Sequence, residues 1–527
     1  MKNKKIFLSI LICIILISIA VAKKQVENDI FYTIKIGEYI SQNGIGNLTK
    51  DPFSFHDLSY TFPHWLYDLG MYTIYNIGGW DGIYCSTIIF TIILGILIFT
   101  LGYKKSKNEI ISAIFTIIAL YIMTQFLSAR AQLISFSMII LTILNIEKLL
   151  ETGKKRYGIA LVIISLIEVN IHMAVWPFIF VMFLPYLAEY ILIEIINFTQ
   201  KLKKHKPKEE YEFYKIKLRK NSNIKKLFVT MIICACMGIF TPTGITTPYT
   251  YLYKTVIGST MEVIVEHQPA NIGTIYAYSI FTFGIIIILL FCNIKIDIKN
   301  IFFYSGLLIL YLNTVRQLSM FVLIMTPIYC EILSNILNHY FPNLHNKVIN
   351  FLNKNIFANF IIILILVSIL ILAYNIYKPN LITKYFRSKD YPIDACKWIK
   401  ENLDYKNERI LNQYNYGSYL IFEGIPVLVD SRADLYLPEF NTKTGNAKDG
   451  QDIFTDIVVK ADKGIDVYEM CQKYDITYAI VSAIYEDLYR EVERDKTHFE
   501  KIYPLEKEDY EWNNTFSIYK LKYEIEE

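Results

Sequence analysis

Long apolar segments fill the first 377 residues of this chain and limit the folds that it can adopt. About 20 consecutive apolar residues suffice to cross the hydrocarbon core of a bilayer. A chain of 527 residues with 54% hydrophobic and 19% charged residues is too apolar for a soluble protein of this size. We therefore predict a polytopic α-helical membrane bundle of about eleven spans, at 6–22, 83–102, 110–127, 132–149, 157–171, 174–197, 227–241, 273–293, 299–314, 317–335 and 357–377.

Residues 378–527 have the composition of an ordinary soluble domain and follow the bundle at residues 1–377. Their short β-branched and aromatic runs alternate with amphipathic stretches, which predicts a small α/β domain. We expect strands at 409–412, 419–422, 426–430, 478–481 and 516–521, and helices at 394–402, 467–474 and 485–495.

Basic residues in the connectors predict the orientation in the membrane. Lysine and arginine are enriched in cytoplasmic loops. If Lys2, Lys4 and Lys5 are cytoplasmic, alternation of the spans places every strongly basic connector there too (104–105, 154–156, 200–226 and 336–356). A first outer loop (23–64), a second outer loop (242–272) and the tail 378–527 are then extracytoplasmic. The formal net charge of +4 is too small to indicate a nucleic-acid partner, so topology explains the 200–226 run.

Two arginines stand in short predicted outer connectors. Arg130 and Arg316 each close a hairpin between two apolar spans. An arginine at bilayer depth costs about 2.5–3.5 kcal/mol on insertion scales, so it needs a partner or a water-filled cavity. For either arginine alone, the alternative is a side chain that extends to the lipid headgroups. Two arginines on one side favour a shared anion site, because guanidinium binds phosphate through a planar fork of donors.

Further polar side chains lie on the same predicted side. Glu168 and His172 are four residues apart near the outer end of one span, so they share a helical face. A lone intramembrane histidine is commonly a satisfied interhelical donor, and the alternative is a residue that lines a cavity. Glu266 and His267 belong to the second outer loop.

The first outer loop holds the candidate bases. Asp29 follows the first span by a few residues, and Asp51, His56 and Asp57 are the competing candidates. His64 comes later in the same loop. A carboxylate at the apolar boundary suits a general base, whereas the alternative is a solvated acid that begins an amphipathic helix. Asp29 ranks first because of its place at the interface. The loop has no Asp-x-Asp pair and no His-x-x-x-His spacing, so we expect no cofactor and no obligatory metal.

Short motifs along most of the chain resemble those of the GT-C membrane glycosyltransferases, a group that includes protein O-mannosyltransferases and lipid A aminoarabinose transferases. Arg130-Ala131-Gln132, Glu266-His267-Gln268-Pro269 and Arg316-Gln317 depart from the expected pattern at Ala131, His267 and Gln317. The other matching elements are Asp51-Pro52-Phe53-Ser54, Pro63-His64-Trp65-Leu66, Gly78-Gly79-Trp80, Asn170-Ile171-His172, Thr241-Pro242-Thr243-Gly244, Tyr416-Gly417-Ser418-Tyr419-Leu420 and Asp430-Ser431-Arg432-Ala433-Asp434-Leu435-Tyr436.

The resemblance implies inverting transfer of a sugar from a polyprenyl-phosphate-linked donor. The acceptor would be an envelope glycan, lipid or protein at the outer face of the cell membrane. Asp29 would be the base, with Asp51 and Asp57 as its competitors. The substrate and its phosphate would be bound by Arg130, Arg316, His172, Glu266, His267 and His64.

Two other functions fit the same pattern. A transporter or flippase of a lipid-linked glycan would share the arginines, but it needs a polar route to the cytoplasmic side. We expect few charges in the inner half of the bundle, which argues against transport. A non-catalytic envelope or assembly protein of GT-C-like fold is the other alternative, because a fold alone does not specify an activity.

Overall fold

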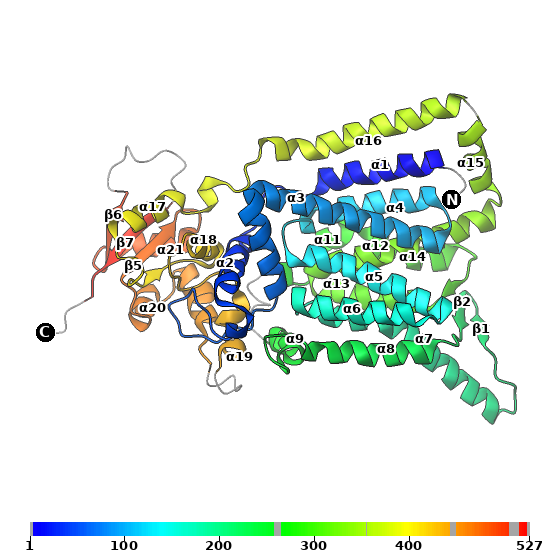
Figure 1. Cartoon of the computed structure of the whole chain (residues 1–527), viewed down its shortest axis with the longest axis horizontal. Helices are drawn as coiled ribbons and strands as arrows, with labels where there is room; N and C mark the ends of the chain where they lie inside the picture. Colours follow the sequence, from blue (N-terminus) through cyan, green and yellow to red (C-terminus); the bar gives the residue numbers. More distant parts are fainter. Residues whose placement is uncertain (1–3, 258–264, 355, 443–449, 505–515, 524–527) are drawn as a thin grey trace. The chain divides into compact units, whose positions relative to one another are not determined.

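The computed structural model describes residues 4–257, 265–354, 356–442, 450–504 and 516–523 (Figure 1). Two compact units share the chain. The first, called here the membrane unit, comprises Met1–Lys24, Tyr84–Phe240 and Glu266–Ile382. The second, called here the mixed unit, comprises Gln25–Ile83, Thr241–Val265 and Thr383–Glu527. The boundary predicted at residue 377 stays a prediction.

Seven helical segments of the described chain are long and apolar enough to cross a membrane, which makes this a multi-pass membrane protein. They are α1 (Lys4–Val21), α3 (Trp65–Ser106), α4 (Glu109–Ile122) with the turn that extends it to Phe126, α5 (Ala131–Thr152), α7 (Trp176–Leu202), α14 (Leu318–Tyr340) with the turn before it, and α16 (Ile356–Ile382).

The predicted count of eleven spans is not confirmed. The other four predicted spans coincide with helices of 13 to 17 residues, which are short for a crossing. These are α6 (Lys155–Ile171), α8 (Ile224–Cys236), α12 (Ser279–Phe291), which follows the short α11 (Ile272–Ala277), and α13 (Ile298–Asn313).

Helix α14 forms the centre of the membrane unit. Its residues from Leu318 to Cys330 are all buried, and it packs against α4, α5 and α13 (Figure 1). A helix that is apolar all round is stable only where it is surrounded, which explains this central place. Helix α16 instead packs on α1 and on the amphipathic α15 (Leu344–Lys354) and exposes most of its apolar side chains.

Charged residues join several helices at the predicted inner end of the membrane unit. Nζ of Lys105 lies 2.7 Å from Glu147 and 3.4 Å from Glu331, and Lys104 lies 3.3 Å from Glu147. The expectation of few charges in this half of the bundle is therefore wrong. Pairing makes these groups tolerable, because an unpaired charge in a low-dielectric interior is far more costly. Strands β1 (Glu210–Phe213), β2 (Ile216–Arg219) and β3 (Ile296–Asp297) form a small sheet in the same unit.

Helix α3 contains a break at Gly79. This residue has φ 57° and ψ −147°, a conformation that glycine adopts without a Cβ penalty. The break separates the amphipathic residues 65–78, which belong to the mixed unit, from the long apolar run that begins at residue 83.

The mixed unit contains a four-stranded sheet of order β4-β5-β7-β6. Strands β4 and β5 are parallel, whereas β7 pairs antiparallel with β5 and β6. The strands are β4 (Ile410–Leu411), β5 (Tyr478–Ser482), β6 (Phe499–Tyr503) and β7 (Phe516–Leu521). The helices are α2 (Asp29–Asn43), α9 (Thr247–Ile257), α17 (Ile393–Asn402), α18 (Tyr414–Phe422), α19 (Pro438–Asn441), α20 (Val467–Lys473) and α21 (Glu486–Arg494).

Most predicted elements of the tail are confirmed, but two predicted strands are wrong. Residues 419–422 lie within helix α18, and 426–430 form an irregular segment with one isolated bridge, between Val427 and Ser54. Both are short apolar runs, which periodicity alone cannot assign to a strand or to a buried helix. Strand β6 was not predicted.

Aromatic packing fixes helix α2 in the mixed unit. Phe31 is fully buried, and five aromatic rings surround it with centroids 4.9 to 5.6 Å away. Edge-to-face aromatic pairs add stability beyond the area that they bury. The first turn of α2, which begins with Asp29, is therefore held by a rigid core. The five rings belong to Trp80, Phe386, Tyr391, Tyr419 and Phe422.

Candidate active site

The membrane unit brings Arg130 and Glu266 together. Arg130 precedes α5 in an extended conformation, and its Nη1 donates to Oε1 of Glu266 over 3.4 Å. A quarter of the Arg130 side chain and half of the Glu266 side chain are exposed. Solvent screens such a pair, so the pair contributes little to stability.

Arg316 and His267 form the second half of this cluster. The backbone N–H of Val315 donates to the carbonyl of Gln268, so the residues next to Arg316 and His267 are joined directly. Burial lowers the pKa of His267, and the nearby charge of Arg316 lowers it further, against the opposite effect of Glu266. The imidazole of His267 is therefore favoured in its neutral form.

One side-chain contact joins the first turns of α5 and α14, the helices that follow Arg130 and Arg316. Nε2 of Gln132, in the first turn of α5, lies 3.5 Å from Oγ of Ser319, in the first turn of α14. Ser319 in turn donates to the carbonyl of Arg316 over 2.9 Å. The predicted residues Arg130, Glu266, His267 and Arg316 thus gather where α5 and α14 begin.

His172 contacts the same helix α5 one turn further along. It ends α6, with its N–H donating to the carbonyl of Glu168, and its Nδ1 lies 3.1 Å from Oγ of Ser135. The His172 side chain is buried, and Glu168 is fully buried.

The mixed unit gathers the first-loop residues around His64. Nδ1 of His64 lies 2.8 Å from Oδ1 of the fully buried Asp68, and Nε2 lies 3.3 Å from the hydroxyl of Tyr32. Tyr32 is three residues beyond Asp29 on α2, so both side chains share one face of that helix.

Carboxylates determine the charge of His64. Burial disfavours the imidazolium, but the charges of Asp68, Asp434 and Asp29 outweigh it, so the pKa of His64 is raised. Asp434 accepts a hydrogen bond of 2.8 Å from the hydroxyl of Tyr251, and burial raises the pKa of its carboxyl. This set of acids opposes the binding of a phosphate beside His64.

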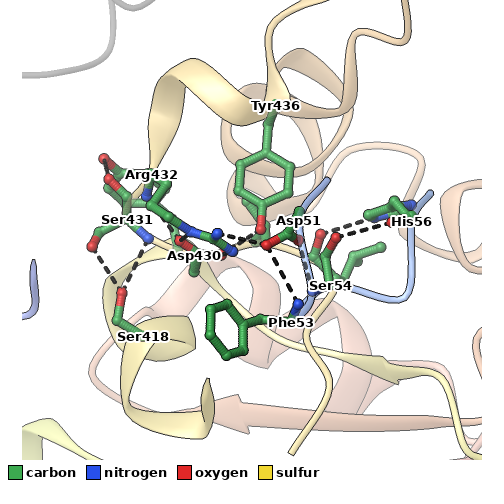
Figure 2. Close-up of polar contacts among 12 residues, drawn as sticks. Asp51, Phe53, Ser54, His56, Ser418, Asp430, Ser431, Arg432 and Tyr436 are labelled. Carbon is green, nitrogen blue, oxygen red and sulfur yellow. Dashed lines mark hydrogen bonds and ion pairs between the residues drawn. The ribbon is translucent and has the colours of Figure 1, made fainter. Parts of the chain in front are cut away.

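Asp51 occupies a different, closed environment (Figure 2). Its Oδ1 accepts from Nη1 of Arg432 over 2.6 Å, and its Oδ2 accepts from the backbone N–H of Ser54 over 2.8 Å. Arg432 also donates to both oxygens of Asp430, which Tyr436 contacts as well. The Asp51 side chain has no exposed area, so this contact does not fit its predicted role as a base.

Asp57 fits that role no better, because it lies at the surface. It is 64% exposed and pairs with Lys50 over 2.7 Å. A solvated surface pair has no special reactivity. Of the three predicted carboxylate bases, Asp29 is half-buried and its charge acts on His64, so it is neither enclosed like Asp51 nor at the surface like Asp57.

The two tail motifs of the GT-C resemblance contact each other. A Cβ on Gly417 would meet the carbonyl oxygen of Val429 at 2.0 Å, so only glycine permits this approach. The hydroxyls of Ser418 and Ser431 lie 2.8 Å apart (Figure 2). The motifs therefore pack the Asp430–Arg432 segment against α18.

Two acids of the His64 cluster were not predicted. Asp68 follows His64 by four residues at the start of a helix, and this spacing is visible in the sequence. The contribution of Asp434 depends on a tertiary contact that no local pattern indicates.

Among the residues that the structure describes, no three His, Cys, Asp or Glu side chains are close enough together to hold one ion. We derive no step through a metal, and the expectation that none is required stays a prediction.

A solved structure has the same fold. The oligosaccharyltransferase of Archaeoglobus fulgidus, crystallised with a tethered acceptor peptide, matches 99% of this chain and 74% of its own, with a TM-score of 0.57 and 12% identity. The likeness shows a shared fold and supports the predicted GT-C-like architecture. The narrower resemblance to O-mannosyltransferases and aminoarabinose transferases stays a prediction. No family model and no curated protein matches the sequence.

Proposed function

We propose that this protein transfers a sugar from a polyprenyl-phosphate carrier to an envelope acceptor at the outer face of the cell membrane. The proposal includes the predicted orientation, with a cytoplasmic N-terminus and an extracytoplasmic tail. The proposed acceptors include a protein, since the similar oligosaccharyltransferase was crystallised with an acceptor peptide.

The reaction is a single displacement. The acceptor hydroxyl oxygen attacks the anomeric carbon while its proton passes to the carboxylate of Asp29. The bond from the anomeric carbon to the phosphate oxygen breaks, and the polyprenyl phosphate leaves as an anion. One displacement inverts the anomeric configuration. Arg130 and Arg316 stabilise the charge that develops on the phosphate.

The arginine cluster carries this proposal. Arg130 and Arg316 begin two helices that the Gln132–Ser319 contact joins, and His267 stands beside Arg316. Glu266, the acid that pairs with Arg130, is half exposed. Two guanidinium groups bring positive charge to this cluster, which suits a lipid-linked phosphate.

Asp29 is the base in this proposal, and His64 is assigned from its charge. Three carboxylates act on His64, so an anionic donor is disfavoured there and a hydroxyl-bearing acceptor is favoured. We therefore assign His64 to the acceptor side, with Asp29 on the helix face of Tyr32.

In the experiment, the full-length chain in nanodiscs is incubated with radiolabelled polyprenyl-phosphate hexoses and pentoses and with an envelope extract. Transfer of label from the lipid phase to an envelope product, lost in Arg316→Ala, supports the proposal. Absence of any glycosidic product while the lipid-linked sugar is bound supports a non-catalytic protein.

Transport is the second candidate, because Lys104, Lys105, Glu147 and Glu331 place charge in the predicted inner half of the bundle. Liposomes that move lipid-linked sugar across the bilayer without forming a new glycosidic bond would favour it.

A further inference from the structure

Glu168 is an anomaly in the membrane unit. Its side chain is fully buried, and among the described residues neither of its carboxyl oxygens has a hydrogen-bond partner in standard geometry. The hydroxyl of Ser135, on the neighbouring α5, is the polar group close enough to act on its charge. Nearly all buried polar groups in proteins have partners, so this carboxyl needs an explanation.

Burial determines the charge of Glu168. A carboxylate in an apolar interior costs several kcal/mol unless a cation or several donors compensate it. One serine hydroxyl does not supply that compensation. The neutral carboxylic acid is therefore favoured, and it carries an O–H donor that a carboxylate lacks.

Ser135 lies between this acid and His172. Its Oγ is 3.1 Å from Nδ1 of His172 and 3.4 Å from the carbonyl oxygen of Ala131. That carbonyl already accepts the backbone N–H of Ser135 within α5, so the imidazole nitrogen is the better acceptor for the hydroxyl proton. A donor on the far side of a hydroxyl strengthens the bond that the hydroxyl donates.

We propose that Glu168 is a positioning residue, which selects the tautomer of His172 through a directed chain of hydrogen bonds. The acid O–H of Glu168 donates to Oγ of Ser135, and the Ser135 hydroxyl donates to Nδ1 of His172. The proton of the neutral imidazole then resides on Nε2, so His172 presents a donor there.

An ionised Glu168 would reverse the chain. A carboxylate accepts from Ser135, whose oxygen then accepts from Nδ1–H of His172, and Nε2 becomes a bare acceptor. The two protonation states of one buried acid thus predict opposite chemistry at the same ring nitrogen. A neutral donor at Nε2 suits a residue that binds an oxygen of the sugar or its phosphate; this use rests on the proposed function, whereas the tautomer does not.

The test is nitrogen-15 NMR of the full-length chain with labelled histidine, using His172→Gln to assign the signal. We expect Nδ1 unprotonated and Nε2 protonated at neutral pH. Glu168→Gln keeps a donor of the same length, so it should preserve this tautomer. Ser135→Ala should shift the population toward Nδ1–H, and the matched control Ser137→Ala, a buried serine on the same helix, should not.

An infrared band of a protonated carboxyl, absent in Glu168→Gln, is the second expected result. The proposal is overturned if the wild type carries its proton on Nδ1, or if Glu168→Gln moves the proton. It is also overturned if Ser135→Ala leaves the tautomer unchanged. These readouts need no sugar donor, so their failure is distinct from absence of transfer. Where transfer is measured, Ser135→Ala should lower its rate about tenfold or more, as loss of an orienting partner does elsewhere.

Discussion

Arg432 and Asp51, 381 positions apart in the chain, form a fully buried ion pair with an Nη1–Oδ1 distance of 2.6 Å. Asp430 accepts from Nε and Nη2 of the same guanidinium. The pair joins the first loop to the tail within the mixed unit. Its role is therefore structural, and the next prediction tests this.

Removal of one partner should destabilise the mixed unit strongly. Arg432→Ala leaves Asp51 and Asp430 buried without a cation, and the loss of one member of a buried pair costs about 3–5 kcal/mol. Thermal unfolding of the purified protein should show a large drop in the melting temperature. Asp57→Asn, at an exposed pair, should change it little. A normally folded Asp51→Asn protein that fails only in sugar transfer would contradict the structural role.

His56 should make the mixed unit sensitive to mild acid. Burial lowers the pKa of His56 to about 4, against the contrary effect of the Leu428 carbonyl, to which its Nε2 lies at 2.9 Å. The unfolded chain titrates near pH 6.5, so this stability is fully present above pH 6.5 and is lost as the pH falls toward about 4. In His56→Gln the fall in melting temperature over this range should be shallower. An identical slope in both proteins would show that His56 is not the group responsible.

His64 should remain protonated above its ordinary range. The carboxylates of Asp68, Asp434 and Asp29 overcome the effect of burial and raise the pKa of His64. Asp68→Asn should lower that pKa, as measured by NMR titration of the ring. Glu38 is another acid on α2, so Glu38→Gln is the control and should leave the pKa of His64 unchanged. A lower pKa in the wild type than in a model peptide would contradict this electrostatic account.

Phosphate binding at the arginine cluster should depend on the planar guanidinium group of Arg316. Arg316→Ala should reduce the affinity for a polyprenyl-phosphate sugar, and Arg316→Lys should restore part of it, since an ammonium is a point charge. Equilibrium binding at low and high salt measures both. Arg156→Ala, at an exposed arginine of the same unit, should bind as the wild type does. Unchanged affinity in Arg316→Ala would remove this residue from the phosphate site.

The sequence predicted the helices better than it predicted the tertiary contacts. All eleven apolar segments are helical, because a run of apolar residues leaves few other solutions in lipid. Four of them are too short to count as crossings by length. Residues 419–422 were misassigned because a short apolar run fits a strand and a buried helix equally well.

The site was predicted where residues share a topological side. The pairing of Arg130 with Glu266 agrees with their predicted common side, whereas the His64–Asp68 pair was missed although its helical spacing is visible in the sequence. The engagement of Asp51 by Arg432 depends on the tertiary fold, so no local pattern indicated it.

The rate of sugar transfer by Asp29→Asn tests the central proposal most directly. A general base contributes roughly 10²–10⁴-fold to a rate, so we expect a loss of at least about 10²-fold with an unchanged melting temperature. Glu38→Gln, on the same helix, should transfer at the wild-type rate. Full transfer by Asp29→Asn would contradict the account.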